Sequence, residues 1–201
     1  MSLLDIFFPK QCFNCRKEGS YLCDKCSLFL TDLPDTEMEG FEQLTCCWEY
    51  NGIIKRIIWE AKKNGIFDAL KELIDKAMSE RETFLPEDLF ITFVPGRKDE
   101  ERIKGFNHAE VIARRLSEIT ERRLIPLLET KIVKKQEGLD KKERFKNVKG
   151  GFKVKKGVVV PEKVLLVDDI LVSGATMAEC CRELRENGAK KVWGFTLTKV
   201  N

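Results

Sequence analysis

Residues 164–176 read Val-Leu-Leu-Val-Asp-Asp-Ile-Leu-Val-Ser-Gly-Ala-Thr, and this stretch decides the fold. Its four leading apolar residues predict a strand that is buried on both faces, and residues 177–187 predict the helix that follows. Two adjacent carboxylates, Asp168 and Asp169, stand at the end of the strand, before a tight loop around Gly174. Backbone N–H groups in such a loop and at a helix N-terminus bind phosphate. The stretch therefore predicts a sugar-phosphate site at a strand–loop–helix junction.

The polar side chains of this stretch suit a ribose phosphate. Asp168 and Asp169 would accept hydrogen bonds from vicinal ribose hydroxyls, and the hydroxyls of Ser173 and Thr176 would donate to phosphate oxygens. The predicted phosphate-binding residues are Val172, Ser173, Gly174, Ala175 and Thr176. A strand that happens to end in two exposed acids is the alternative. A P-loop is disfavoured because no Gly-Lys-Ser/Thr sequence occurs in the chain.

The chain from residue 86 onward alternates predicted strands with predicted helices. The strands are predicted at residues 89–94, 124–128, 158–160, 164–167 and 192–199. A helix is predicted from Asn107 to about Ile119, with Asn107 as its N-cap and Glu110 completing a capping box. This alternation predicts an α/β fold with a mostly parallel sheet flanked by helices. Ligands of such folds bind at the carboxyl ends of the strands, where the two acids stand.

The segment before this core predicts one strand and two helices. Residues 41–50 are apolar enough for a strand. After them, apolar residues recur at helical spacing on both sides of a break at Asn64-Gly65, which predicts two helices. We expect residues 41–85 to form a hood next to a core that spans residues 86–201.

Four of the eight cysteines follow a metal-binding pattern. Cys12-x2-Cys15 and Cys23-x2-Cys26 are two Cys-x-x-Cys pairs separated by seven residues. Four thiolates at this spacing favour a structural Zn²⁺ site in which protein fills every ligand position. A module of residues 1–30 is too short to build its own core, so the metal would supply most of its folding free energy. A disulfide framework and a redox Cys-x-x-Cys pair are the alternatives.

The remaining composition points to a cytoplasmic protein. No apolar run approaches the length of a transmembrane helix, and the N-terminal residues lack the basic segment of a signal peptide. We therefore expect no membrane insertion and a reducing environment, which disfavours disulfides. Residues 31–40 are acidic and predict a linker. The last four cysteines lack metal-binding spacing, and we expect them to be small buried apolar residues: Cys46, Cys47, Cys180 and Cys181.

Charge is unevenly distributed along the chain, although the net charge is only +3. Residues 131–156 contain eleven Lys or Arg and three Asp or Glu, which gives this segment a local charge of +8. A connection of this length is usually functional or disordered. Three interpretations of this basic segment stay open: it contacts nucleic acid, it closes over a polyanionic ligand, or it forms a solvated surface loop.

Residues 164–176 resemble the phosphoribosyl-pyrophosphate (PRPP) motif of the type I phosphoribosyltransferases, with Ser173 where many members have Thr. Further segments, in the same order along the chain, resemble the ComF family, which is linked to bacterial DNA uptake. These segments are Leu3-Leu-Asp-Ile-Phe-Phe-Pro9 before the paired cysteines, Tyr50-Asn-Gly-Ile-Ile-Lys55, Val94-Pro95 with Gly105-Phe-Asn-His-Ala-Glu110, and Gln136-x2-Leu139-x4-Arg144-x2-Asn147. The family usually has Gln at the position of His108, which is either a first-turn residue of a capped helix or a general base.

The resemblance implies a type I phosphoribosyltransferase fold with an N-terminal zinc module, PRPP as ligand, and Mg²⁺ held chiefly by PRPP and water. Asp168 and Asp169 would be the catalytic pair. The candidates for binding pyrophosphate or closing over it are Arg97, Lys98, Arg102, Lys104, Lys135 and Arg144. Two functions stay open. One is phosphoribosyl transfer with release of pyrophosphate, in the context of DNA uptake. The other is a non-catalytic, PRPP-responsive module that binds single-stranded DNA or a helicase-like partner.

Overall fold

The computed structural model describes residues 9–80, 85–86, 88–96, 106–131 and 148–200. Its main sheet has four parallel strands in the order β1–β6–β5–β2. These strands are β1 (Gln43–Glu49), β2 (Phe90–Phe93), β5 (Lys163–Leu171) and β6 (Lys191–Lys199). A separate antiparallel pair consists of β3 (Leu128–Thr130) and β4 (Phe152–Val154). The helices are α2 (Asp24–Ser27), α3 (Gly52–Asn64), α4 (Phe67–Glu80), α6 (His108–Thr120) and α8 (Ala175–Glu186). The predicted α/β class with a mostly parallel sheet is confirmed.

Both faces of the sheet are buried, which explains the continuous apolar run at the start of β5. Leu165 and Val167 join the cluster that contains the buried residues of α3, α4 and α6. Val164 and Leu166, which alternate with them, join the second cluster with the buried residues of α8. Successive strand residues point to opposite faces, so one strand supplies both cores.

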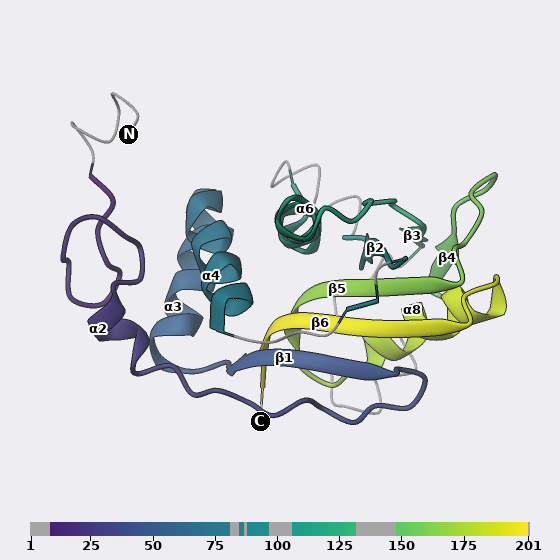
Figure 1. Cartoon of the computed structure of the whole chain (residues 1–201), viewed down its shortest axis with the longest axis horizontal. Helices are drawn as coiled ribbons and strands as arrows, with labels where there is room; N and C mark the ends of the chain where they lie inside the picture. The colour runs from purple at the N-terminus through teal and green to yellow at the C-terminus, as the bar shows by residue number, and fades with distance from the viewer. Residues whose placement is uncertain (1–8, 81–84, 87, 97–105, 132–147, 201) are drawn as a thin grey trace.

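The carboxyl ends of the parallel strands share one edge of the sheet, and α3 and α4 of the predicted hood stand beside it. The first part of the predicted hood is instead β1, an edge strand of the sheet, so the name hood is used below for α3 and α4. In Figure 1 the strands end next to α3 and α4, and the module that contains α2 lies beyond these helices, at the far end of the molecule. Helix α3 follows β1 after a two-residue turn and buries Ile54, Ile57, Ile58 and Ala61. It ends at Gly65, whose φ of 66° is in the left-handed region and whose N–H donates to the carbonyl of Ala61.

The predicted linker, residues 31–40, lies along the free edge of β1. It makes isolated antiparallel bridges from Asp32 to Trp48 and from Thr36 to Leu44. The backbone N–H of Thr36 also donates to the carbonyl of Leu44 at 2.8 Å. The segment therefore covers a strand edge that would otherwise expose unpaired backbone groups.

Two predicted strands are wrong. Leu124 makes an isolated parallel bridge to Ile91, and the strand predicted at residues 124–128 begins only at Leu128. Residues 158–160 form no strand in the described part of the chain, and the Val159 side chain is 86% exposed. The partner of β3 is instead residues 152–154, inside the predicted connection. Because Leu128 pairs with Val154 at one end of this ladder, residues 158–160 lie beyond it.

The cysteines outside the Cys-x-x-Cys pairs are buried, as predicted. Cys46, Cys47 and Cys180 expose 0% of their surface and Cys181 exposes 1%. They fill the core as small apolar residues. Among the described helices, none combines the length and the apolar composition that crossing a membrane would require.

Candidate functional site

The two acids lie within β5 and not after it. The strand continues to Leu171, with Asp168 paired to Thr196 and Ile170 paired to Thr198 of β6. The two carboxylates stay close enough for each to influence the pKa of the other. Burial, with the nearby charge of Asp168 as a second cause, raises the pKa of the Cys180 thiol on α8. Asp168 therefore lies toward α8, whereas the partners of Asp169 come from α3 and α6.

Lys62 of α3 forms an ion pair with Asp169. The distance from Lys62 Nζ to Asp169 Oδ2 is 2.5 Å, and the two side chains are 30% and 15% exposed. The positive charge that His108 would carry, at the start of α6, also favours the ionised form of Asp169. Lys62 was not predicted as a site residue, because a lysine in the last turn of an amphipathic helix is normally solvated.

Burial and charge shift the pKa values of the two acids in opposite directions. Burial raises the pKa of Asp168 well above its usual value, and the charge of Asp169 raises it further. Burial also acts to raise the pKa of Asp169, but the charge of Lys62 and its hydrogen bond outweigh burial and hold that pKa below its usual value. Asp168 Oδ1 accepts from the Asp169 N–H at 2.9 Å. The site thus combines a readily ionised carboxylate with one that keeps its proton to higher pH.

The predicted phosphate loop leads directly into a helix N-terminus. Gly174 has a φ of 76° and is the N-cap of α8, which begins at Ala175. Ser173 Oγ accepts from the Ala175 N–H at 3.4 Å, Thr176 lies in the first turn, and Val172 is 49% exposed. The first N–H groups of a helix have no partner within the helix, so they provide donors for an anion. The structure brings the five predicted loop residues together with the two acids.

Met38 of the linker lies against this loop. A Cβ atom added at Gly174 would overlap with the Met38 Cε. The close approach, together with the left-handed φ, gives two physical reasons for glycine at this position. The linker therefore lies along β1 and also reaches the loop that follows β5.

The six basic candidates for binding pyrophosphate, Arg97, Lys98, Arg102, Lys104, Lys135 and Arg144, lie outside the described residues. The start of α6 is described and confirms Asn107 as its N-cap, whereas Glu110, which was predicted to complete a capping box, forms an ion pair with Arg114. Asn107 Oδ1 accepts from the Ala109 N–H, and Asn107 Nδ2 donates to the carbonyl of Val94, both at 2.9 Å. These bonds fix the start of α6 against the end of β2.

His108 packs in an aromatic group between α6 and the hood. Its ring lies edge-on to Phe106 with centroids 4.8 Å apart, and Phe106 lies edge-on to Phe67 of α4 at 4.3 Å. His108 therefore contributes to the contact between the core and the hood.

The four cysteines of the Cys-x-x-Cys pairs converge. The sulfur atoms of Cys12, Cys15, Cys23 and Cys26 all lie within 4.8 Å of one another, and those of Cys15 and Cys23 are 3.5 Å apart. A tetrahedral Zn²⁺ with bonds of about 2.3 Å places its sulfurs about 3.8 Å apart, so the cluster fits such an ion. Burial acts against ionisation of Cys12, yet hydrogen bonds from neighbouring backbone groups lower its pKa to about 6, which favours the thiolate that a metal binds.

Glu72 of α4 joins the cysteine cluster to the hood. Its carboxylate oxygens accept from the Tyr21 N–H at 3.2 Å and from the Leu22 N–H at 2.9 Å. Both donors directly precede Cys23. Like Lys62, Glu72 was not predicted, because a polar residue on the outer side of an amphipathic helix has no sequence mark that distinguishes it from a solvated one.

Comparisons with known proteins give consistent names. Competence protein ComFC of Streptococcus pneumoniae is 29% identical over 191 residues, which are 94% of this chain and 81% of that protein. Competence protein ComFC of Bacillus subtilis is 27% identical over 180 residues, 89% of this chain and 72% of that protein. Competence protein F of Haemophilus influenzae is 35% identical over 102 residues, 46% of this chain and 43% of that protein. No family model matches the chain.

A solved structure described as the allosteric regulatory enzyme of purine biosynthesis is similar with 23% identity and a TM-score of 0.41. The similarity covers 63% of this chain and 24% of that one. The two ComFC proteins, in contrast, match over most of their own length and most of this chain. These sequence matches confirm the resemblance to the ComF family. The chain combines a mostly parallel α/β fold with an N-terminal cluster of four cysteines.

Proposed function

We propose that this chain binds PRPP, as a phosphoribosyltransferase or a descendant of one, and acts in DNA uptake. The observation that carries the proposal is the continuous path from two carboxylates in β5, through a left-handed Gly174, to the N-terminus of α8. A sugar phosphate with vicinal hydroxyls matches this path in polarity, because it offers hydroxyl donors to the carboxylates and an anion to the loop N–H groups. The names of the three competence proteins support the role in DNA uptake.

The geometry suits displacement of pyrophosphate from the anomeric carbon of ribose. That reaction develops positive charge on the sugar and negative charge on the leaving group, so the protein must hold the sugar still and stabilise the leaving group. Asp168 and Asp169 hold the ribose hydroxyls, and the N–H groups of residues 172–176 hold the 5′-phosphate. Mg²⁺, which suits binding through phosphate oxygens and water, offsets the charge of pyrophosphate.

The test is a calorimetric titration of PRPP with Mg²⁺ into the native protein and the Asp168→Asn/Asp169→Asn variant. We expect micromolar binding that the variant loses. Asp88→Asn is the matched control, because Asp88 lies before β2 at the opposite edge of the sheet and pairs with Lys163 at 2.7 Å. Binding that survives in the double variant would remove the carboxylates from the site. Binding without pyrophosphate release, across a screen of nucleobases and amines, would favour the non-catalytic form.

We also propose that the four clustered cysteines hold one structural Zn²⁺. With four sulfur ligands, no position would remain open for catalysis on the metal. Metal analysis of the native protein should find about one zinc per chain. The content should fall in Cys12→Ser and Cys23→Ser but not in Cys46→Ser, which lies in the core far along the sequence from the cluster. Equal zinc content in all three variants would overturn the assignment.

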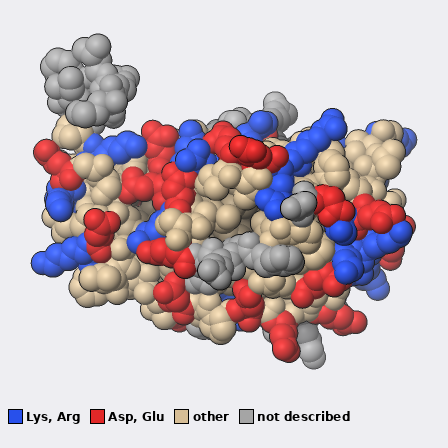
Figure 2. All heavy atoms as spheres, viewed as in Figure 1, with Lys and Arg blue, Asp and Glu red and all other residues tan. Residues whose placement is uncertain are grey.

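A second candidate function, binding of single-stranded DNA, is favoured by the outer face of α3. Trp59 is 50% exposed, and Lys63 Nζ lies 4.5 Å from the centre of its ring. One turn earlier, Lys55 Nζ lies 5.9 Å from the ring centre of Tyr50. Aromatic rings that stack on bases, next to cations that pair with phosphates, are the usual surface for single strands. Figure 2 shows that acidic and basic side chains of the described residues are otherwise mixed over the face it draws.

This candidate predicts binding that depends on Trp59 and on salt. Fluorescence anisotropy with a labelled oligonucleotide should show weaker binding in Trp59→Ala and a steep fall of affinity with salt. Phe29→Ala is the control, because Phe29 is also an exposed aromatic residue, at 69%. Absent binding, or equal loss in both variants, would count against a site on α3. The basic residues Lys141, Lys142 and Lys146 lie outside the described residues. Their part in binding DNA is tested separately, with charge-reversal variants.

A further inference from the structure

The contact between Lys62 and Asp169 joins the hood to the sheet at the candidate ligand site. Lys62 lies in the last turn of α3, beside the buried Ala61, and its ammonium group reaches the carboxylate in β5 at 2.5 Å. Lys55 and Lys63 of the same helix are exposed instead, and their ammonium groups lie over the rings of Tyr50 and Trp59. Lys62 is only 30% exposed, so its charge enters a partly desolvated site. An ion pair in such a place interacts more strongly than a surface pair.

In the part of the chain that the structure describes, groups from four elements lie around Asp169. Asp168 is the neighbouring acid on β5, Lys62 comes from α3, and His108 comes from α6. From β6, the Thr198 hydroxyl donates to the main-chain carbonyl of Asp169 at 3.4 Å. Lys62 is thus the permanent cation among them, because a histidine loses its charge near neutral pH.

We propose that Lys62 is a positioning residue of this site, which holds the Asp169 carboxylate ionised and oriented to accept hydrogen bonds from the hydroxyl groups of a sugar phosphate. The proposal rests on the proposed function. An ionised carboxylate accepts more strongly than a protonated one, whose proton would occupy one of its oxygens. Without Lys62, the burial of Asp169 would act without its main opposing charge and would favour the protonated carboxyl.

The role of Lys62 has a pH signature that a purely structural role would lack. Lys62 lowers the pKa of Asp169, so its removal should raise that pKa. In Lys62→Met the acceptor is then lost at a pH where the native protein still has it. Affinity for PRPP should therefore fall most at the acidic end of the range and recover as the pH rises. The charge of PRPP, and with it the binding of Mg²⁺ by PRPP, also changes with pH, so the difference between variant and native protein is the quantity to compare.

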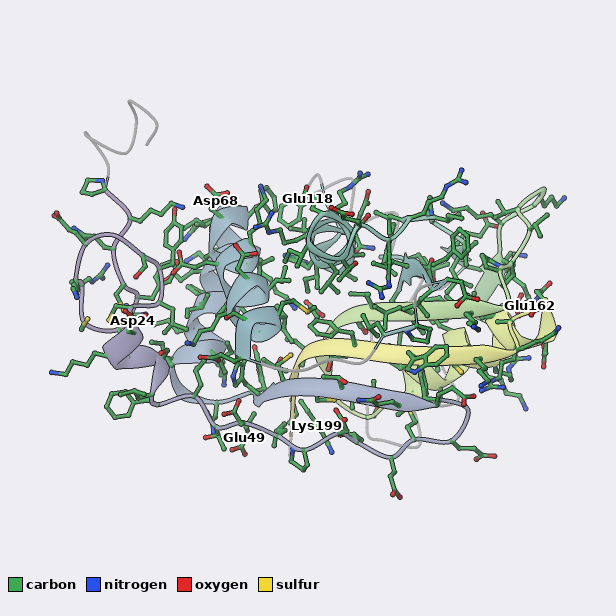
Figure 3. The ribbon with its side chains drawn as sticks, viewed as in Figure 1. Asp24, Glu49, Asp68, Glu118, Glu162 and Lys199 are labelled. Carbon is green, nitrogen blue, oxygen red and sulfur yellow. The ribbon has the colours of Figure 1, made fainter. Side chains whose placement is uncertain are left out.

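Calorimetry with PRPP and Mg²⁺ at pH 6.0 to 8.5 tests this inference. We expect Lys62→Met to bind about tenfold or more weakly at the acidic end, where tenfold corresponds to about 1.4 kcal/mol. Lys62→Arg, which keeps the charge, should restore most of the affinity. The control is Lys71→Met, since Lys71 of α4 makes an exposed pair with Asp68 at 3.6 Å. Figure 3 shows Asp68 at the surface of α4, at its upper end. Native affinity in Lys62→Met at every pH would overturn the proposal.

A second measurement separates the inference from the proposed function. Carboxyl carbon NMR of the ligand-free protein follows Asp169 directly, with its signal assigned from the Asp169→Asn variant. The Asp169 carboxyl should titrate at higher pH in Lys62→Met than in the native protein and stay low in Lys62→Arg. If PRPP fails to bind the native protein, the proposed function fails, but this titration still decides the role of Lys62. An unchanged titration in folded Lys62→Met would refute it.

Discussion

At the scale of single residues, the register of β5 decides the chemistry of the site. Asp168 and Asp169 were predicted as a pair at the end of a strand, and both were expected to face a ribose. The strand instead continues through them, because their backbone pairs with β6 as far as Leu171. The two acids then differ in their contacts, because it is Asp169 that forms the ion pair with Lys62. The sequence shows the two acids but not how far the ladder extends, which depends on the neighbouring strand.

Asp168→Asn should stabilise the ligand-free protein at neutral pH. A carboxyl whose pKa is raised in the folded state contributes stability below its unfolded pKa of about 3.8, and that contribution is lost as pH rises through the folded pKa. Asparagine avoids the loss and still offers an oxygen to the Asp169 N–H. Thermal unfolding at pH 7 should show a gain of about 2–4 °C, the shift that about 1 kcal/mol gives in a chain of this size.

The gain in Asp168→Asn should shrink as the pH falls below the unfolded pKa of about 3.8, where the native carboxyl is protonated in both states. The same variant should bind PRPP more weakly, because a neutral amide is a weaker hydrogen-bond acceptor than a carboxylate. Such a gain of stability at the cost of function is common at binding sites. A lower melting temperature at pH 7 would show that the burial of Asp168 carries no such penalty.

Gly174→Ala should weaken phosphate binding as well as the fold. Its φ of 76° costs a residue with a Cβ about 1–2 kcal/mol, and the added methyl would displace Met38. Gly157 is a matched control, because it has the same φ of 76° and no atom within 4 Å of an added Cβ. Urea unfolding should show a similar loss in both alanine variants, whereas PRPP affinity should fall only in Gly174→Ala. Equal affinity in both would place the phosphate elsewhere.

At the scale of elements, α8 has two tasks, of which the sequence predicts one. Its position after the Gly174 loop follows from the strand–loop–helix pattern. Its second task is to hold the β3–β4 pair: Glu179 accepts from the Gly150 N–H at 2.6 Å, and Glu183 accepts from the Val154 N–H at 3.1 Å. Both glutamates are buried, at 8% and 4% exposure. Acids one turn apart on a helix normally predict a solvated face, so this contact could not be foreseen.

Glu183→Ala should destabilise the protein by about 1–3 kcal/mol, because it leaves the N–H of Val154 without its carboxylate in a partly buried place. Lys153, whose Nζ lies 3.3 Å from Glu183, would also lose its partner. Glu186→Ala removes an exposed acid from the same helix and should cost less than about 0.5 kcal/mol. Urea unfolding gives both values. Hydrogen exchange at residues 152–154 should quicken only in Glu183→Ala, and equal exchange would mean that β4 is held by other contacts.

At the scale of the whole molecule, the sequence predicts the parts but not how they join. The cysteine pairs, the hood and the α/β core were each predicted from local spacing. Their order in space comes from contacts between residues far apart in the chain. Buried residues of the cysteine module, including Phe13 and Leu22, share one core cluster with α3 and α4, and Figure 1 shows the hood between that module and the sheet. Local patterns carry no information on such contacts, which also explains why Lys62 and Glu72 were missed.

This arrangement predicts that zinc removal will weaken PRPP binding, although the four clustered cysteines belong to the N-terminal module and not to the site. Glu72 of α4 holds the N–H groups of Tyr21 and Leu22, so loss of the metal should loosen α4, then α3, and with it the contact of Lys62 to Asp169. Chelation should speed hydrogen exchange in α3 and α4 and lower PRPP affinity. Glu72→Ala should lower the affinity for PRPP by the same route while the protein keeps its zinc. Asp68→Ala, on the same helix, should change neither the affinity nor the zinc content. If the zinc-free protein binds PRPP at full affinity, the module and the site are energetically independent, and the hood alone positions Lys62.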